Sequence, residues 1–234
     1  MEVNTSKRIQ NNVIDSLEKK VLKWLAQRMP RWVTSDFLTF IGFLGSVMIG
    51  AGFVLTNWSI NWLWLTIAGL FVNWYGDSLD GTLARVRNTQ RPVYGYYLDH
   101  TMDVVNEILM FVGLGFSPLV HLPIALAAFA CYLALTLNVS INAHLRGEFK
   151  LSYFKLGPTE FRLIVAIICL VFIYCPAVNS YAHAVTILGN TYVYGIFDFI
   201  ALGITALLGL IWVVTIIGDI KYYSKVDPPK KFEE

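Results

Sequence analysis

The chain of 234 residues has few charged side chains. Asp, Glu, Lys and Arg make up 15% of it, against about 25% in a typical soluble domain. The net charge of +2 is too small to indicate a nucleic-acid partner. Cysteine is also scarce, which excludes a disulfide framework. We expect the three cysteines to be buried as small apolar side chains, since all lie in apolar stretches: Cys131, Cys169 and Cys175.

Apolar and aromatic residues are abundant instead. Hydrophobic residues account for 56% of the chain and aromatic residues for 15%, and the mean hydropathy is +0.57. This composition excludes a disordered chain and a collagen-like repeat. Because a membrane-spanning helix needs about 20 residues, half a dozen such helices would use about half of the chain. The composition therefore predicts an all-α polytopic membrane protein.

Six apolar segments follow a more polar beginning. We place the spans near residues 37–56, 60–80, 98–117, 120–143, 160–175 and 196–218. Turn-forming residues separate them, and the longest such stretch runs from Pro176 to Tyr194. The prediction is one transmembrane domain of six helices over residues 35–220. A cytosolic segment, residues 1–34, precedes it, and a cytosolic tail, residues 221–234, follows it.

The first segment has helical periodicity before Pro30. Lys19 and Lys23 fall opposite its apolar positions, whereas Arg28 falls among them. This pattern predicts a basic amphipathic helix that lies along the membrane surface. An ordinary solvated helix is the alternative. The apolar positions that define the periodicity are Val13, Leu17, Val21, Trp24, Leu25 and Met29.

The basic residues are confined to alternate connections between the spans. Seven of the 18 Lys and Arg residues precede the first span, and three lie between spans two and three. Four lie around the connection of spans four and five, and four follow span six, so the remaining loops have none. Positively charged residues stay on the cytosolic side of a membrane. Both chain ends and both basic loops are therefore predicted to be cytosolic, which requires an even number of spans.

Five acidic residues gather at the predicted cytosolic ends of spans two and three: Asp77, Asp80, Asp99, Asp103 and Glu107. The spacing puts the first two aspartates on one helix face, and the next two on another. If these faces meet, four carboxylates come together and repel one another unless cations intervene. Carboxylate oxygens suit two divalent ions such as Mg²⁺ or Mn²⁺.

Other interpretations of these residues remain open. The acids could pair with Arg85, Arg87 and Arg91, although five acids outnumber three arginines. Gly81 and Ala84, one turn beyond the first aspartates, could admit a ligand or a neighbouring helix. Intramembrane acids also occur in ion channels and transporters. That class is disfavoured because spans four to six have acids only near their ends, at Glu160, Asp198 and Asp219.

Residues 77–103 resemble the signature of a known family. They read D-S-L-D-G-T-L-A-R, then nine residues, G, three residues, D, three residues and D. This is similar to the pattern D-x-x-D-G-x-x-A-R…G-x-x-x-D-x-x-x-D of the CDP-alcohol phosphotransferases. The predicted six spans and N-terminal surface helix also agree with that family. Residues 33–39, V-T-S-D-F-L-T, resemble its T-P-N-x-L-T at the start of the first span, with Ser35 and Asp36 replacing Pro and Asn.

The resemblance implies a membrane enzyme of phospholipid synthesis. It would transfer a substituted phosphate group from a CDP-linked donor to an alcohol and release CMP. Asp77, Asp80 and Asp99 would hold two metal ions. Asp103 would hold metal and also take the proton from the attacking hydroxyl group. Four further residues of the motif would line the CDP pocket: Gly81, Ala84, Arg85 and Gly95.

The acceptor is less defined by the sequence. Asp99-His100 resembles the branch that joins a CDP-amino alcohol, with choline or ethanolamine, to diacylglycerol. Other branches join CDP-diacylglycerol to inositol phosphate, glycerol phosphate or serine. Apolar span faces would permit a homodimer, as in relatives. Basic residues of the second cytosolic loop could bind an acceptor phosphate or lipid headgroups, or could be ordinary positive-inside residues: His144, Arg146, Lys150, Lys155 and Arg162.

Overall fold

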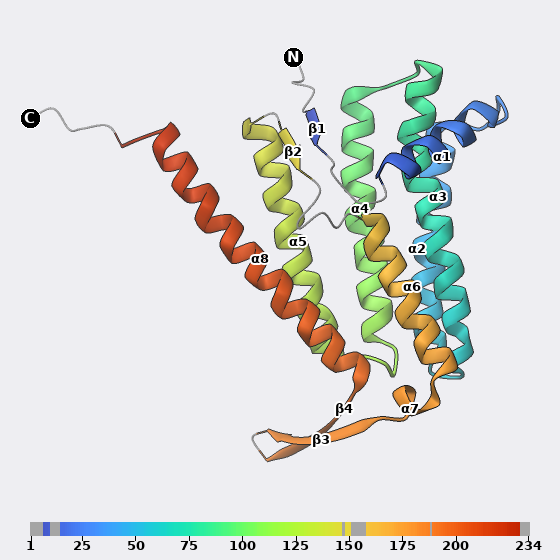
Figure 1. Ribbon diagram of the computed structural model, residues 1–234, viewed down its shortest axis with the longest axis vertical. Helices are drawn as coiled ribbons and strands as arrows, with labels where there is room; N and C mark the ends of the chain where they lie inside the picture. The colour runs from blue at the N-terminus through green and yellow to red at the C-terminus, as the bar shows by residue number, and fades with distance from the viewer. Residues whose placement is uncertain (1–6, 10–14, 147, 151–157, 188, 230–234) are drawn as a thin grey trace, which may run out of the picture.

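The computed structural model describes residues 7–9, 15–146, 148–150, 158–187 and 189–229 (Figure 1). These residues form a bundle of long helices with two small pairs of strands. In chain order the elements are β1 (Lys7–Ile9), α1 (Asp15–Arg28), α2 (Ser35–Leu55), η1 (Ile60–Trp62), α3 (Leu63–Arg87), α4 (Pro92–Gly115), α5 (Leu122–Arg146), β2 (Glu148–Lys150), α6 (Pro158–Tyr174), α7 (Pro176–Asn179), β3 (Ala182–Ile187), β4 (Asn190–Gly195) and α8 (Ile196–Val226).

Each of the six predicted spans coincides with a long helix: α2, α3, α4, α5, α6 and α8. The ends differ most at α8, which continues to Val226 rather than residue 218, and around the acidic motif. Helix α3 continues to Arg87 rather than residue 80, and α4 begins at Pro92 rather than residue 98. Hydropathy marks the apolar part of a helix, whereas its ends depend on local backbone chemistry. Asn88 ends α3 in the left-handed conformation, with φ 54°, and Pro92 occupies the first turn of α4, where no N–H is needed.

Within the part of the chain that the structure describes, three helices are long and apolar enough to cross a membrane: α2, α5 over Leu122–Leu145, and α8. Helices α3 and α4 carry the aspartates, and α6 has 17 residues. The structure is mostly helical, as predicted, and also contains two short pairs of strands among its described residues. Part of the predicted turn stretch before α8 forms an antiparallel hairpin, β3–β4. Its β-branched and aromatic residues favour strands, and Gly189 adopts a positive φ of 82° in the turn.

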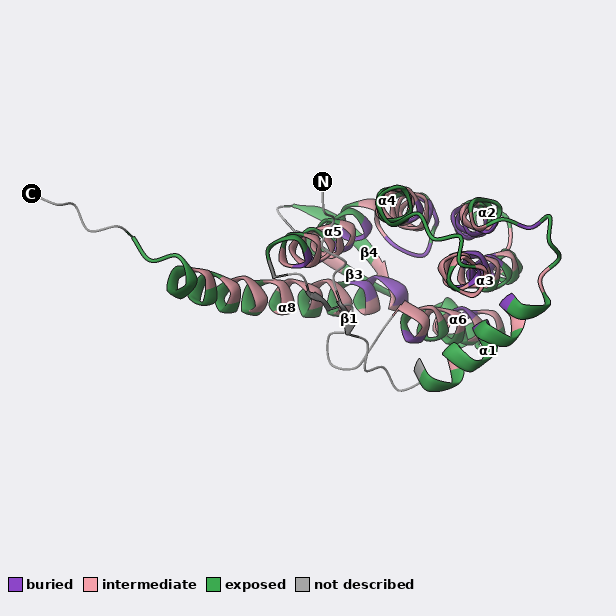
Figure 2. Cartoon of the chain, turned by 90° about the horizontal axis from the view of Figure 1, so that it is seen from above, coloured by how far each residue is buried: buried purple, intermediate pink, exposed green. Residues whose placement is uncertain are grey.

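Close packing of α2 against α3 and α4 fixes the position of the acidic helices. A Cβ atom on Gly76 of α3 would collide with the backbone nitrogen of Gly42 in α2. On the other side of α2, a Cβ atom on Gly113 of α4 would lie 2.5 Å from the Cα atom of Gly50. Seen from above, α2 lies beside both α3 and α4, whereas α8 lies at the outer edge beside α5 (Figure 2). Helix α2 is therefore the common support of the two helices that carry the acidic motif.

The main apolar core lies in the half of the bundle nearer the β3–β4 hairpin. Its buried members are contributed by α2, α3, α5, α6 and α8 and by the turn before α5: Ile49, Phe53, Leu63, Leu70, Leu119, Val120, Ile124, Ala125, Cys169, Phe172, Phe197 and Ala201. Cys169 is buried as expected, but Cys175 is exposed, because it follows the last turn of α6. The half that holds the acidic motif is filled in part by polar contacts.

Helix α1 lies at the acidic end of the bundle and packs on α3 (Figure 1). Its buried residues, Leu22 and Ala26, join a small cluster with Leu79 and Leu83 of α3. They were not among the positions that defined the predicted apolar stripe. Of those positions, Val13 lies outside the described residues, and among the described ones only Leu25 and Met29 pack against this cluster. Arg28, which interrupted the stripe, lies over the Trp24 ring, 4.2 Å from its centroid.

Candidate active site

The four aspartates lie near the ends of two antiparallel helices, α3 and α4, which are joined by a short connection. Asp80 is within electrostatic range of Asp77 and Asp99. Asp103 is within range of the same two residues and of Glu107. Acidic residues of α3 and α4 therefore influence one another electrostatically, and a metal site shared by the four aspartates stays a prediction. Among the residues that the structure describes, however, no three carboxylate, imidazole or thiol groups are arranged to hold a metal ion.

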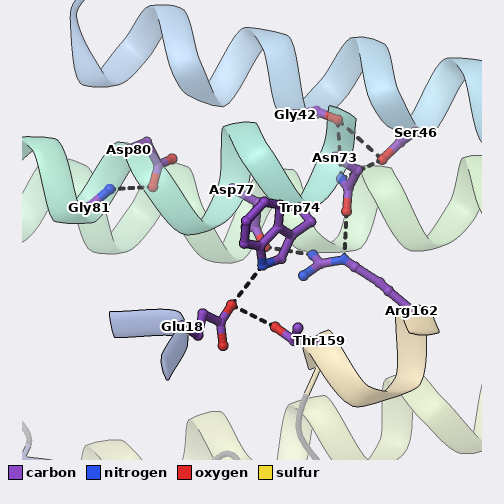
Figure 3. A network of polar contacts seen from close by, with 10 residues as sticks. All are labelled: Glu18, Gly42, Ser46, Asn73, Trp74, Asp77, Asp80, Gly81, Thr159 and Arg162. Atoms are coloured by element: carbon purple, nitrogen blue, oxygen red, sulfur yellow. Dashed lines mark hydrogen bonds and ion pairs between the residues drawn. The ribbon is translucent and has the colours of Figure 1, made fainter. Parts of the chain in front are cut away.

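Asp80 is held by the first turn of α2. Its Oδ2 atom accepts a hydrogen bond from Thr39 Oγ1 at 2.7 Å. Its Oδ1 atom accepts one from the backbone N–H of Gly81 (Figure 3). Ser35 Oγ donates to the main-chain oxygen of Asp80 at 2.9 Å. Ser35 stands where the family pattern has proline, so this departure supplies a hydroxyl group that fixes α3 to α2.

Asp77 has a different partner, on α6. The Nη2 atom of Arg162 donates to Asp77 Oδ2 at 2.6 Å. The Nε atom of the same guanidinium donates to Asn73 Oδ1 at 2.9 Å, so that the fork spans one turn of α3 (Figure 3). Asn73 is buried and its amide nitrogen donates to the oxygens of Gly42 and Ser46 on α2. One chain of hydrogen bonds therefore connects α6, α3 and α2 at the acidic motif.

Glu18 extends this network to α1. Its Oε1 atom accepts hydrogen bonds from Trp74 Nε1 on α3 and from Thr159 Oγ1 on α6, both at 2.7 Å (Figure 3). Trp74 follows Asn73 directly, and Thr159 precedes Arg162 by one helical turn. The N-terminal helix thus touches both helices that carry the Asp77–Arg162 ion pair.

Two arginines near the motif have partners other than its acids. Arg87 donates to the main-chain oxygens of Met29, Pro30 and Val33 and so holds the connection between α1 and α2. Arg91 pairs with Asp36 at 2.5 Å, and this contact raises the pKa of Arg91. The alternative prediction, that the acids pair with the nearby arginines, is therefore wrong for these two. The arginine that pairs with Asp77 comes from α6.

The residues predicted to line a CDP pocket are accessible. The three atoms nearest to a Cβ atom placed on Gly81 all belong to Arg85, the closest at 3.4 Å, so no neighbouring helix packs there. Arg85 is exposed, and its Nη2 atom donates to Thr82 Oγ1 at 3.1 Å. Gly95 is exposed, and no described atom lies within 4 Å of the position that a Cβ atom on it would occupy. Ala84 is half-buried.

The basic residues assigned to an acceptor do not form one group among the described residues. His144 is exposed near the end of α5, and Arg162 lies inside the acidic network instead of in the loop. Lys155 and the side chains of Arg146 and Lys150 lie outside the described residues.

His100 is stacked on Tyr96, with 4.1 Å between ring centroids, and its Nδ1–H donates to the Tyr96 carbonyl at 3.0 Å. Its Nδ1 atom also lies 3.8 Å from a carboxylate oxygen of Asp99.

Sequence reasoning missed several members of the network. Asn73 carried a usable signal, because an amide within an apolar span is costly unless it is hydrogen-bonded, and it lies one turn before Asp77 on the same face. Thr39 lies one turn after Ser35 and could have been placed with it. Glu18 and Thr159 carried no such signal, since the hydrogen bond between them joins residues 141 positions apart.

The fold and the site together define a helical bundle with membrane-crossing helices and an acidic site where α3 and α4 are joined. The chain belongs to the CDP-alcohol phosphatidyltransferase family, whose model matches residues 32–218. The predicted family is therefore confirmed.

Individual relatives carry two different names. The chain is 33% identical over 98 residues to cholinephosphotransferase 1 of Xenopus laevis, which is 39% of this chain and 24% of that protein. It is 34% identical over 99 residues to phosphatidylinositol phosphate synthase of Cutibacterium acnes, which is 40% of this chain and 44% of that protein. The matched parts cover less than half of these relatives.

A solved structure supports the fold. The crystal structure of Mycobacterium tuberculosis phosphatidylinositol phosphate synthase with CDP-DAG bound matches with a TM-score of 0.55 and 17% identity. The match covers 94% of this chain and 100% of the other.

Proposed function

We propose that the protein is a membrane-embedded CDP-alcohol phosphotransferase. It transfers a substituted phosphate group from a CDP-linked donor to the hydroxyl group of an alcohol and releases CMP. The observation that carries this proposal is the motif of residues 77–103, in which Asp80 and Asp103 each lie within electrostatic range of Asp77 and Asp99. Membership of the family gives this arrangement its chemical meaning.

The donor groups fit a pair of divalent cations. Carboxylates that repel one another favour bound cations, and Mg²⁺ prefers oxygen ligands. Glu107, one turn beyond Asp103, adds a buried oxygen, Oε2, that has no hydrogen-bond partner among the described residues. We assign Asp77, Asp80, Asp99 and Asp103 as the residues that hold two Mg²⁺ or Mn²⁺ ions. When bound, such ions stabilise the charge on the attacking and leaving oxygens of an in-line displacement.

The chain's own residues then have separate tasks. Asp103 takes the proton of the acceptor hydroxyl as its oxygen bonds to the phosphorus. The phosphoanhydride bond to the cytidine monophosphate breaks, and CMP leaves with the electron pair. Thr39 and the backbone N–H of Gly81 orient the Asp80 carboxylate. Space for the CDP group is provided by the small or exposed motif residues Gly81, Ala84, Arg85 and Gly95.

The six long helices are assigned as six spans with both chain ends cytosolic. The support is the one-sided distribution of Lys and Arg, which follows the positive-inside rule. Helix α1, the α3–α4 connection and the end of α8 lie at one end of the bundle, opposite the β3–β4 hairpin (Figure 1). On this assignment the site opens where membrane lipids and soluble substrates meet.

Helix α1 is assigned to the membrane surface because its sides differ in chemistry. One side packs on α3 through Leu22 and Ala26. A second side carries exposed apolar residues, Leu17, Val21 and Trp24, and a third carries exposed lysines. A helix that lies at a membrane surface and packs on a protein contacts the protein, the lipid and the water, and these three sides of α1 suit those three surroundings.

The preferred substrates are a CDP-amino alcohol with choline or ethanolamine and diacylglycerol. The supporting features are His100 next to Asp99 and the relatives named cholinephosphotransferase 1. The alternative is phosphatidyl transfer from CDP-diacylglycerol to inositol phosphate, glycerol phosphate or serine. It is supported by a relative of similar identity and by the fold of a structure that contains CDP-DAG. A homodimer within the membrane is compatible with either.

The test is a substrate panel with the purified protein in lipid nanodiscs. Each CDP-linked donor is combined with each candidate alcohol, and CMP release is measured with and without Mg²⁺. We expect Mg²⁺-dependent CMP release with one class of pair, which identifies the branch. Absence of CMP release with every pair would refute the proposal. Cation flux through proteoliposomes in that case would favour the transporter class instead.

A further inference from the structure

The contact of Glu18 lies at the meeting point of three helices, and nothing in the acidic motif predicts it. A single carboxylate oxygen accepts a hydrogen bond from Trp74 of α3 and another from Thr159 of α6 (Figure 3). Both distances are 2.7 Å, which is short for a nitrogen donor and typical of a charge-assisted bond. The carboxylate also lies at the first turn of α6, where a negative charge is favourable.

The two donors are close in sequence to the residues that bind each other across the site. Trp74 follows Asn73, and one turn later α3 presents Asp77. Thr159 is one turn before Arg162 on α6. The guanidinium of Arg162 donates to Asn73 Oδ1 at 2.9 Å and to Asp77 Oδ2 at 2.6 Å. Making both hydrogen bonds at once requires a fixed position of α6 along the axis of α3. Glu18 ties the same two helices about one turn away from this fork.

We propose that Glu18 is a positioning residue for the acidic site. By joining Thr159 to Trp74, it fixes the start of α6 against α3 and so places the guanidinium of Arg162 between Asn73 and Asp77. Glu18 acts through Arg162 and touches no reacting atom. This inference rests on the proposed function for its effect on turnover, but the contact itself can be tested without turnover.

Four variants separate the two arms of the contact. Glu18→Ala removes both hydrogen bonds, Thr159→Val removes the α6 arm, and Trp74→Phe removes the α3 arm. Glu18→Gln retains a carbonyl oxygen that can accept both bonds, and we expect it to restore most of the function. Asp227→Ala is the matched control, since it removes an exposed carboxylate at the far end of α8.

The first measurement is hydrogen exchange of the backbone amides of residues 162–166 by mass spectrometry. Glu18→Ala and Thr159→Val should increase their exchange, while Glu18→Gln and Asp227→Ala leave it near the wild-type rate. Exchange in α2 should be unchanged, which shows that the variants are folded. Equal exchange of residues 162–166 in wild type and Glu18→Ala would overturn the proposal, whatever the protein's activity.

The second measurement is a double-mutant cycle with Arg162→Gln on CMP release. We expect Glu18→Ala, which removes two hydrogen bonds to a carboxylate, to lower kcat/KM about tenfold in the wild-type background. In the Arg162→Gln background the same substitution should lower it by less than about twofold. If Glu18→Ala lowered kcat/KM by the same factor in both backgrounds, the two residues would act independently, which would contradict action through Arg162. If wild type releases no CMP, the proposed function fails, and the exchange measurement alone decides on the contact.

Discussion

At the scale of single residues, the site depends on how each carboxylate is paired. Asp80 is hydrogen-bonded to a hydroxyl and an amide, and Asp77 to a guanidinium. Asp103 lies within electrostatic range of three other acids and of Arg162. A carboxylate near other carboxylates is a suitable proton acceptor when bound cations neutralise the negative charge of those neighbours. This difference in partners supports the assignment of Asp103 as the base.

Replacing Asp103 tests that assignment directly. Asp103→Asn keeps the size of the side chain but removes its basicity, so we expect CMP release to fall by about a hundredfold or more. The thermal unfolding midpoint should stay close to wild type, because a charge among like charges is removed. Asp227→Asn, at the exposed end of α8, is the control and should retain full turnover. An Asp103→Asn enzyme that works at the wild-type rate would exclude the residue as base.

Asn73 provides a second test, this time of stability. Its amide makes three hydrogen bonds in a buried position, to Gly42, Ser46 and Arg162. We expect Asn73→Ala to lower the free energy of unfolding by about 1–3 kcal/mol, since it leaves the Gly42 carbonyl and the Arg162 guanidinium without this partner. Ser46→Ala removes one hydroxyl and should cost less. Denaturant titration in detergent measures both. A larger loss in Ser46→Ala than in Asn73→Ala would contradict the network.

At the scale of helices, glycines decide how closely α3 approaches α2. Gly76 faces the backbone of α2 at a distance that leaves no space for a methyl group. We expect Gly76→Ala to force the helices apart, to destabilise the protein by about 1–3 kcal/mol, and to reduce turnover because Asp77 and Asp80 move with α3. Unfolding and CMP release are measured on the same preparation.

Gly203 of α8 is the matched control for this substitution. No described atom lies within 4 Å of the position that its Cβ atom would occupy. Gly203→Ala should therefore be neutral, or stabilising by up to about 1 kcal/mol through helix propensity. If both variants behaved alike, the close approach of α2 and α3 would have no role in the site.

The helices themselves could be predicted because their apolar runs are long and uninterrupted. Helix α8 is an example, since its 31 residues include the whole predicted sixth span. The strands β3 and β4 could not be separated from a turn-rich loop, because a single short hairpin contributes little periodicity. In the site, the spacing of the aspartates was readable along one helix. The role of Arg162 could not be predicted from the sequence, because its partners Asn73 and Asp77 lie more than 80 positions away along the chain.

At the scale of the whole molecule, the distribution of charge and the arrangement of the helices predict the same orientation in the membrane. The α3–α4 connection, α1 and the end of α8 lie at one end, and the β3–β4 hairpin at the other (Figure 1). Cys175 is exposed just after α6, at the hairpin end, whereas Cys169 is buried. On the proposed orientation, Cys175 is a natural chemical label for the non-cytosolic side.

Cysteine labelling can test this orientation. A membrane-impermeant maleimide added to sealed, right-side-out vesicles should modify Cys175 of the wild-type protein. In a Cys175→Ser background, Ser16→Cys on α1 and Ser224→Cys near the end of α8 place a thiol at exposed positions of the opposite end. We expect these two variants to be modified only after the vesicles are lysed, because an even number of spans puts both on the cytosolic side. Modification of one of them before lysis and the other only afterwards would require an odd number of spans, and the six-span assignment would then be wrong.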